Sequence, residues 1–503
     1  MNYRAVGWLL GCVLLLLAGV LILPAAVALF YREHDALRAC LASAGVAAVL
    51  GGTLTLRNRG ATVAEQGRVD YFRREGLAAV GLCWFAAGAV GALPFLFSGQ
   101  IPSLVDAFFE SASGFTTTGA TILDGATLDA LPRSISFWRS FTHWLGGIGI
   151  VLVFVLLFPT GGRSLFRSEV PGVSREAVQQ RVRDSAWSLV RIYVGLTAIE
   201  VVVLMALGMT PFDAVLHSFG TLATGGFSSH SASVAFFASW QIEFVIVIFM
   251  FLAGVNFGLY DSMLRNGWRE TWRLARQSEE LRIYTALIVG SSLVLTGVLW
   301  LWGGSNGDAA SDLPDYSSLS LALRDASFNV VSVQTSTGFG TADFDRWPQF
   351  CRMLLMLLAF TGACAGSTGG GLKVMRFILL AKASLRGFKR FARPRAIHPV
   401  RIDGQPIEDR FVAGINGYFG MWAIVFSLGA LAMTSLGVDL ITATTSVLAT
   451  LNNIGPGLAA VGPSMNYGDM PELAKIMLSV FMIVGRLEFY AVVVLFLPTF
   501  WRH

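Results

Sequence analysis

Ten long apolar runs constrain this chain more than any other feature, because a helix needs about 20 apolar residues to cross a bilayer. Only 14% of the 503 residues are charged and the mean hydropathy is +0.63, whereas soluble proteins carry about 25% charged residues. We therefore predict an all-α integral membrane protein. The expected spans are residues 7–30, 39–56, 76–97, 136–159, 189–209, 236–264, 283–302, 350–381, 411–436 and 473–499.

The basic residues predict the orientation of these spans. Four alternate linkers, 57–74, 163–191, 265–282 and 373–410, contain 26 of the 37 Lys and Arg residues. By the positive-inside rule, these linkers and both termini face the cytoplasm. The net charge of +5 then reflects topology, so we expect no nucleic-acid partner. Contact of linker 373–410 with anionic lipid is an alternative reading of its charge.

The opposite linkers contain four related segments, each with about a dozen helix-forming residues followed by a polar stretch with glycine. They read VDAFFESASGFTTTGATI (105–122), FDAVLHSFGTLATGGFSS (212–229), RDASFNVVSVQTSTGFGTAD (324–343) and ATTSVLATLNNIGPGLAAVG (443–462). Our alignment places Gly119, Gly225, Gly338 and Gly455 in register, at intervals of 106, 113 and 117 residues. An Asp-Ala pair lies 13, 12 and 13 residues ahead of that glycine in the first three. The chain thus repeats one unit four times.

This repeat predicts the domain organisation and an ion pathway. Residues 1–75 form two leading helices with a basic linker, and the four repeats occupy 76–187, 188–281, 282–410 and 411–503. Non-helical backbone at membrane depth persists only where protein buries it or where it lines water. We therefore expect the four loops to surround one pore with pseudo-fourfold symmetry. Their carbonyl groups would replace the hydration shell of a cation, and the short helices would point their negative ends at it.

The predicted filter residues, which form the potassium site, are Thr117, Thr118, Gly119, Ala223, Thr224, Gly225, Ser336, Thr337, Gly338, Asn453, Ile454 and Gly455. None of them is a carboxylate, which favours a monovalent over a divalent cation. The alternative is a set of polar re-entrant turns or small-residue packing seams. We expect Glu110 and Asn329, each nine residues before a filter glycine, to hydrogen-bond behind these loops.

The motifs TTTGAT (116–121), TGGFSS (224–229), TSTGFG (335–340) and NNIGPGL (452–458) resemble the four filter segments of the Trk/Ktr/HKT superfamily of potassium transporters. The two helices before the first repeat resemble its TrkH/TrkG-type branch. The resemblance implies potassium as the transported ion, because glycine stands at all four key positions. It also implies a homodimer in the bacterial cytoplasmic (inner) membrane and a cytoplasmic nucleotide-binding regulatory ring that is TrkA-like.

The stretch FTGACAGSTGGGLK (360–373) predicts a break in the third repeat, because so many glycines destabilise a helix. It is no Walker A loop, since Lys373 is followed by valine. The resemblance implies an intramembrane gate. The gate residues are Gly362, Gly366, Ser367, Thr368, Gly369, Gly370 and Gly371, together with Lys373 and Arg486. The alternatives are a small-residue packing seam and, for Arg486, pairing with a buried acid or loop carbonyls.

The expected function is potassium uptake through a gated, channel-like pore. Symport of potassium with sodium or protons is the alternative, and a secondary solute transporter with inverted repeats is disfavoured because all four short helices enter from one side. We expect no enzyme activity and no organic cofactor, because no nucleophile lies beside a base. The five cysteines are scattered and predict neither disulfides nor a zinc site. Four polar residues inside spans receive no role: Arg139, His143, Glu200 and Glu243.

Overall fold

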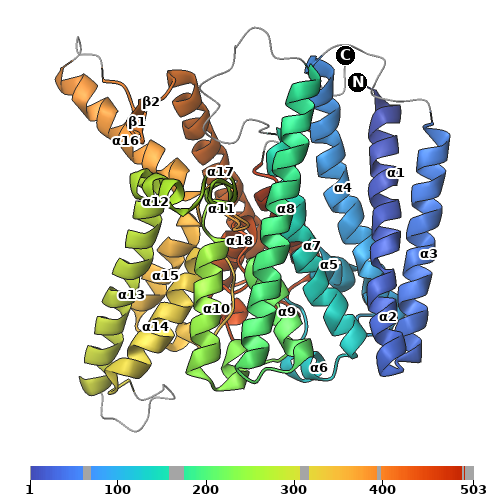
Figure 1. The fold of residues 1–503 in the computed structure, drawn as a ribbon. Coiled ribbons are helices and arrows are strands. Elements are labelled where there is room, and N and C mark those ends of the chain that lie inside the picture. Colours follow the sequence, from blue (N-terminus) through green and yellow to red (C-terminus); the bar gives the residue numbers. More distant parts are fainter. Residues whose placement is uncertain are drawn as a thin grey trace.

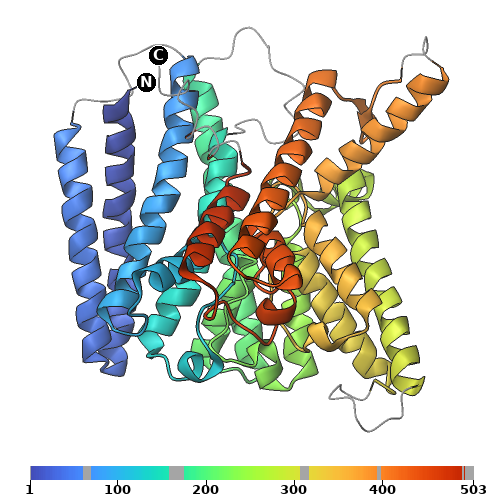
Figure 2. The same cartoon turned by 180° about the vertical axis from the view of Figure 1, so that it is seen from behind.

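The protein is a helical bundle, described by a computed structural model over residues 2–59, 69–157, 175–305, 316–393 and 398–489 and positions 492 and 495 (Figures 1 and 2). Its helices are α1 (Tyr3–Val20), α2 (Ile22–Tyr31), α3 (His34–Arg57), α4 (Val69–Phe97), α5 (Leu104–Phe115), α6 (Gly125–Asp129), α7 (Arg133–Leu157), α8 (Arg175–Ala206), α9 (Pro211–Leu222), α10 (Trp240–Ala253), α11 (Phe257–Asn266), α12 (Trp268–Gln277), α13 (Glu279–Ser305), α14 (Leu319–Gln334), α15 (Gln349–Thr361), α16 (Val374–Ala392), α17 (Asp409–Ser435), α18 (Leu440–Leu451) and α19 (Glu472–Arg486). Three 3-10 turns are η1 (Ser233–Phe237), η2 (Phe344–Arg346) and η3 (Ala459–Val461). Strands β1 (Arg401–Ile402) and β2 (Gln405–Pro406) form one antiparallel hairpin.

The membrane-spanning helices agree with most of the predicted spans. Within the described residues, six segments are long and apolar enough to cross a bilayer: Tyr3–Tyr31, His34–Arg57, Glu75–Phe97, Ala186–Ala206, Glu279–Gly303 and Asp409–Ser435. Helix α7 covers most of the predicted span 136–159. The predicted span 350–381 is divided into α15 and α16, as its glycines predicted. Helix α19 is described as far as Arg486, and most of residues 490–499 of the predicted last span lies outside the described residues.

The prediction of a continuous span over 236–264 is wrong, because α10 and α11 meet at an angle of 85°. Gly254 follows α10 and lies so close to Tyr284 that an added Cβ would be 2.2 Å from the phenol oxygen. Asn256 then starts α11, since its side-chain oxygen accepts a hydrogen bond from the Gly258 amide at 2.7 Å. The chain therefore turns sideways at this corner although its apolar character continues.

The four predicted short helices are present as α5, α9, α14 and α18. Each packs against the span that precedes it: α5 on α4, α9 on α8, α14 on α13 and α18 on α17. Each also packs against a helix of the repeat before it: α9 on α7, α14 on α10 and α18 on α15. The cycle closes because α5 packs against α19, the last described helix. The four short helices thus bring the four polar loops that follow them to the centre of the bundle.

The leading pair of helices packs through glycines. A Cβ added to Gly51 on α3 would lie 2.8 Å from the Leu15 amide nitrogen and 2.9 Å from the Gly11 carbonyl oxygen of α1. The neighbouring Gly52 has no atom within 4 Å of the same position. Close backbone approach of this kind is typical of small residues between membrane helices.

We expect Gly51→Leu to lower the midpoint of thermal unfolding in detergent, because the added side chain must push α1 away from α3. Overpacking of this kind costs about 1–3 kcal/mol. Gly52→Leu is the matched control and should leave the midpoint close to that of the wild type. Equal shifts for the two variants would contradict the glycine contact.

Candidate functional site

The loops after the four short helices share one backbone conformation. In each, an amide shortly after the helix end donates to a carbonyl five residues earlier: Thr118 to Ser113 at 2.9 Å, Gly225 to Gly220 at 2.8 Å, Thr337 to Ser332 at 2.8 Å and Ile454 to Ala449 at 2.8 Å. The residue before each of these amides has a left-handed backbone, with φ of 52° at Thr117, 53° at Thr224, 60° at Ser336 and 53° at Asn453. Four equal turns therefore follow four short helices.

This geometry corrects the predicted register of the second repeat by one residue. Gly225 occupies the position of Thr118, so Gly226 stands in line with Gly119. Their φ angles agree, at 78° and 81°. A signal in the sequence supports the same register, because Asp213 lies 13 residues before Gly226, the spacing seen in the first and third repeats. Ala223, predicted as a filter residue, ends α9 as its C-cap.

The four glycine segments lie side by side in a closed ring. A Cβ added to each glycine would approach the backbone of the next segment: from Gly119 to the Gly225 oxygen at 2.0 Å, from Gly226 to the Thr337 oxygen at 2.1 Å, from Gly338 to the Gly455 nitrogen at 3.2 Å and from Gly455 to the Gly119 oxygen at 2.7 Å. The distances from Gly119 and Gly226 are far below any contact that a real side chain makes. Neighbouring segments therefore meet mainly through backbone atoms, with the Pro456 side chain also close to Gly338.

Hydroxyl and amide groups brace the ring from behind. The Thr116 and Thr118 hydroxyls are 2.8 Å apart, and those of Thr335 and Thr337 are 2.7 Å apart. Asn453 donates to the Thr118 hydroxyl at 3.0 Å, which joins the fourth segment to the first. These contacts fix side chains that the sequence placed in the filter motifs, and they leave the backbone to form the inner surface.

The first loop is held by a buried ion pair. Both oxygens of Glu110 accept from the Thr121 hydroxyl, and one accepts from the Ile122 amide at 3.0 Å. Arg139 on α7 donates its Nε to Glu110 at 2.6 Å and its Nη1 to the Ser228 carbonyl at 3.0 Å. The expectation for Glu110 is confirmed. Arg139, which had no predicted role, links the first loop to the second.

His217 holds the second loop and was missed by the sequence analysis. It lies nine residues before Gly226, the spacing that Glu110 has to Gly119, and its Nε2 is 3.0 Å from the Ser228 hydroxyl. The corrected register would have identified it. Asn329 bonds mainly to the Asp325 carbonyl at 2.9 Å and reaches the Thr341 hydroxyl only at 3.5 Å, so its support of the third loop is weaker than predicted.

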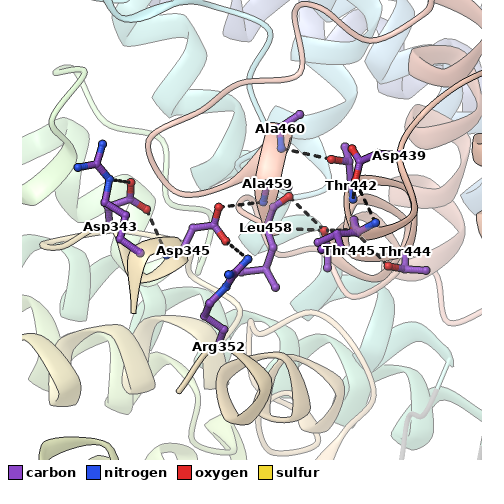
Figure 3. Close-up of polar contacts among 12 residues, drawn as sticks. Asp343, Asp345, Arg352, Asp439, Thr442, Thr444, Thr445, Leu458, Ala459 and Ala460 are labelled. Atoms are coloured by element: carbon purple, nitrogen blue, oxygen red, sulfur yellow. Dashed lines mark hydrogen bonds and ion pairs between the residues drawn. The ribbon is translucent and has the colours of Figure 1, made fainter. Parts of the chain in front are cut away.

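An ion pair and several hydrogen bonds hold the fourth loop on its outer side (Figure 3). Asp345 accepts from the Ala459 amide at 3.0 Å and forms an ion pair with Arg352 at 2.6 Å. The Thr445 hydroxyl accepts from the Leu458 amide at 3.1 Å. At the start of α18, hydrogen bonding to Thr442 keeps the pKa of Asp439 below its usual value. These outer carboxylates thus order the loops.

The Gly-rich segment between α15 and α16 lies directly against the inner ends of these loops. The Gly370 amide donates to the Ser336 hydroxyl at 2.6 Å. Gln334, the last residue of α14, donates to the Gly362 carbonyl at 2.6 Å. A Cβ added to Gly370 would lie 2.6 Å from the Asn452 carbonyl oxygen. Only a chain without side chains fits this position.

Two buried basic side chains hold the Gly-rich segment by donating hydrogen bonds to its carbonyl groups. Arg486 is 2% exposed and donates to the Thr368 carbonyl at 2.9 Å, and Lys373 donates to the Gly369 carbonyl. Arg486 therefore contacts loop carbonyls, one of the alternatives left open by the sequence. Several buried polar atoms in this region have no hydrogen-bond partner among the described residues: Thr117 Oγ1, Asn452 Oδ1 and Nδ2, Asn453 Oδ1 and Arg486 Nε.

The remaining polar residues inside the spans, His143, Glu200 and Glu243, are all buried. The Nδ1 of His143 lies 2.8 Å from the Gly114 carbonyl oxygen. Glu243 forms an ion pair with Arg324. Glu200 is fully buried on α8. Groups of three or more His, Cys, Asp or Glu residues that could hold a metal ion are not found in the part of the chain that the structure describes.

Comparison with known proteins gives this arrangement a family. A family model described as TrkH, cation transport protein, matches residues 65–502. The chain belongs to this family. It is 41% identical over 510 residues to the Trk system potassium uptake protein TrkH of Salmonella typhimurium, with full coverage of both chains, and 30% identical over 485 residues to TrkG of Escherichia coli, covering 95% of this chain and 94% of TrkG.

A solved structure agrees with the fold. The crystal structure of the potassium transporter TrkH from Vibrio parahaemolyticus superposes with a TM-score of 0.88 at 36% identity, and the match covers both chains completely. The membership predicted from the four glycine motifs is therefore confirmed, as is the all-helical membrane fold.

We expect Glu110→Gln to destabilise the protein by about 3 kcal/mol, because it leaves the buried Arg139 guanidinium without its counter-charge. The double variant Glu110→Gln/Arg139→Gln should recover part of this loss, since no unpaired charge remains. The midpoint of thermal unfolding in detergent measures both effects. Additive losses in the double variant would contradict the coupling of the two residues, and Arg38→Gln, which removes one member of an exposed ion pair, is the control.

Proposed function

We propose that this protein takes up potassium ions through the ring of four glycine segments. The observation that carries the proposal is the closed ring, in which each segment approaches the next through backbone atoms. Carbonyl oxygens at such a ring replace the hydration shell of a weakly hydrated monovalent cation. Relatives over the whole chain are named as potassium uptake proteins, which supports potassium as the ion.

The electrostatics of the site favour a cation without a fixed anionic ligand. The short helices α5, α9, α14 and α18 end immediately before the four segments. Their C-terminal ends carry partial negative charge and point toward the ring. The four segments 116–121, 224–229, 335–340 and 452–458 contain no carboxylate, an arrangement that suits passage better than tight binding.

The Gly-rich segment is the proposed gate. It lies against Ser336 and Asn452 at the inner side of the ring, and Arg486 and Lys373 place two positive charges beside it. These charges oppose the passage of cations while the segment stays in place. Thr117 Oγ1, both side-chain polar atoms of Asn452 and Asn453 Oδ1 have no hydrogen-bond partner among the described residues, which fits a pathway in which water or ions complete their hydrogen bonds.

The family resemblance supports a proposal for the wider assembly. We place the protein in the bacterial cytoplasmic membrane with its termini and basic linkers in the cytoplasm, as a homodimer with a TrkA-like nucleotide-binding ring. Helix α16 supports a cytoplasmic docking role, because it ends in Lys389 and Arg390 and exposes Phe388 and Phe391. The repeats at 76–187, 188–281, 282–410 and 411–503 are the units that we propose to surround the pore.

Purified protein in liposomes should take up tracer rubidium when only a potassium gradient is imposed. Gly338→Ser should reduce this uptake about tenfold, because a side chain on Gly338 would press on the fourth segment at 3.1–3.2 Å and its backbone is left-handed. Gly340→Ser is the matched control, since the space around Gly340 is open up to 4.0 Å. Uptake that requires a sodium or proton gradient would instead establish coupled symport.

Arg486→Ala should raise the open probability in single-channel recordings, because it removes a charge and a hydrogen bond that hold Thr368 of the Gly-rich segment. Arg486→Lys keeps the charge and should stay close to the wild type. Unchanged openings in Arg486→Ala would contradict the gating role, and a rise of equal size in both variants would show that charge is not the cause.

A further inference from the structure

Helix α12 presents one exposed face made of tryptophan and arginine. Trp268 and Trp272 are 62% and 48% exposed, and Arg269, Arg273 and Arg276 are exposed beside them. The spacings of three and four residues place these five side chains on one side of the helix. The opposite side contains the buried Thr271. The positive-inside rule alone does not account for this face, because arginine residues without tryptophan would be enough to orient the linker in the membrane.

Contacts among the side chains of this face hold them in place. The rings of Trp268 and Trp272 stack with centroids 5.8 Å apart, and the Arg276 guanidinium lies 4.9 Å from the centroid of Trp272. Arg273 is paired with Glu270, while Arg269 and Arg276 add charge at either end of the face. Tryptophan rings prefer the headgroup level of a bilayer, and guanidinium groups bind phosphate oxygens in a bidentate way.

The position of α12 fits the membrane surface. It immediately precedes α13, whose apolar span begins at Glu279, and it lies at the upper end of α13, below α16, in the view of Figure 1. Met263 and Leu264, close to the end of α11 that leads into α12, are also apolar and 44% and 68% exposed. An amphipathic helix with arginine and tryptophan at this depth suits anionic phospholipid headgroups.

The helices on both sides of α12 hold the Gly-rich segment. At the corner before α11, the Phe257 amide donates to the Gly366 carbonyl and the Cys364 amide donates to the Gly254 carbonyl, both at 3.0 Å. At the start of α13, Glu280 accepts from the Ala365 amide at 2.7 Å. A force on α12 is therefore transmitted to the Gly-rich segment from two sides.

We propose that the exposed face of α12 docks on anionic phospholipid headgroups of the cytoplasmic leaflet and that docking stabilises the Gly-rich segment in its position against the four glycine loops. Anionic lipid then lowers ion flux, because it favours the conformation in which the proposed gate is in place. The docking stands on the geometry of α12 alone. The effect on flux rests on the proposed function.

Docking is tested by fluorescence quenching in vesicles with a constant mixture of phosphatidylglycerol and phosphatidylcholine, in which one lipid or the other is brominated. The chain has 13 tryptophans. The fluorescence of Trp268 and Trp272 is therefore obtained as the difference between the wild type and W268F/W272F. We expect this difference signal to be quenched more by brominated phosphatidylglycerol, and R269Q/R273Q/R276Q to lose that preference. A difference signal that neither lipid quenches, as for a surface that faces a protein partner, would overturn the proposal.

The effect on flux is tested by rubidium uptake while the phosphatidylglycerol fraction rises from zero to half. Wild-type uptake should fall about fivefold, the lower range of coupling between linked sites, and R269Q/R273Q/R276Q should show no such fall. The control R57Q/R59Q removes two exposed arginines at the end of α3 and should behave as the wild type. Equal loss of lipid dependence in the control would overturn the coupling. Absence of wild-type uptake at every composition would overturn the proposed function, with docking still decided by quenching.

Discussion

Backbone that leaves a helix at membrane depth must have its polar groups satisfied, and the rest of this structure depends on how four loops meet that requirement together. Each loop turns at a left-handed residue and closes on a carbonyl of its own short helix. Neighbouring loops then meet through glycine, and the short helices form a cycle of packing contacts behind them. One loop alone would expose its backbone to lipid, so the fold exists only with all four.

Ion pairs connect neighbouring helices of this cycle. Arg139 of α7 holds Glu110 of α5 within the first repeat and reaches the second, Arg324 of α14 holds Glu243 of α10, and Lys475 of α19 holds Asp106 of α5 at 2.7 Å. Each pair joins a short helix to a helix packed beside it. Because charges removed from water are costly unless paired, the two ion pairs between repeats and the hydrogen bond from Arg139 to the Ser228 carbonyl oppose any slip of one repeat along the next. Stability and alignment of the ring therefore come from the same residues.

The sequence predicted the helices well because apolar length is a local property. It predicted the four short helices and their loops because one pattern recurs, and the break before Lys373 because glycine accumulates there. The register of the second loop was placed at Gly225 because two glycines adjoin and letters alone do not distinguish them, although the Asp213 spacing favoured Gly226. The 85° corner after α10 could not be predicted, since Tyr284 and the Gly-rich segment that shape it are distant in sequence.

The four quarters of the ring are not identical. The carbonyl of Gly455 accepts a hydrogen bond from the Tyr467 hydroxyl at 3.0 Å, and Gly455 does not share the positive φ of Gly119, Gly226 and Gly338. A pore built from four copies of one short chain would receive every substitution four times over. Here a single substitution alters one quarter of the ring and leaves three intact, so in the proposed pore the preference among ions would change in small steps.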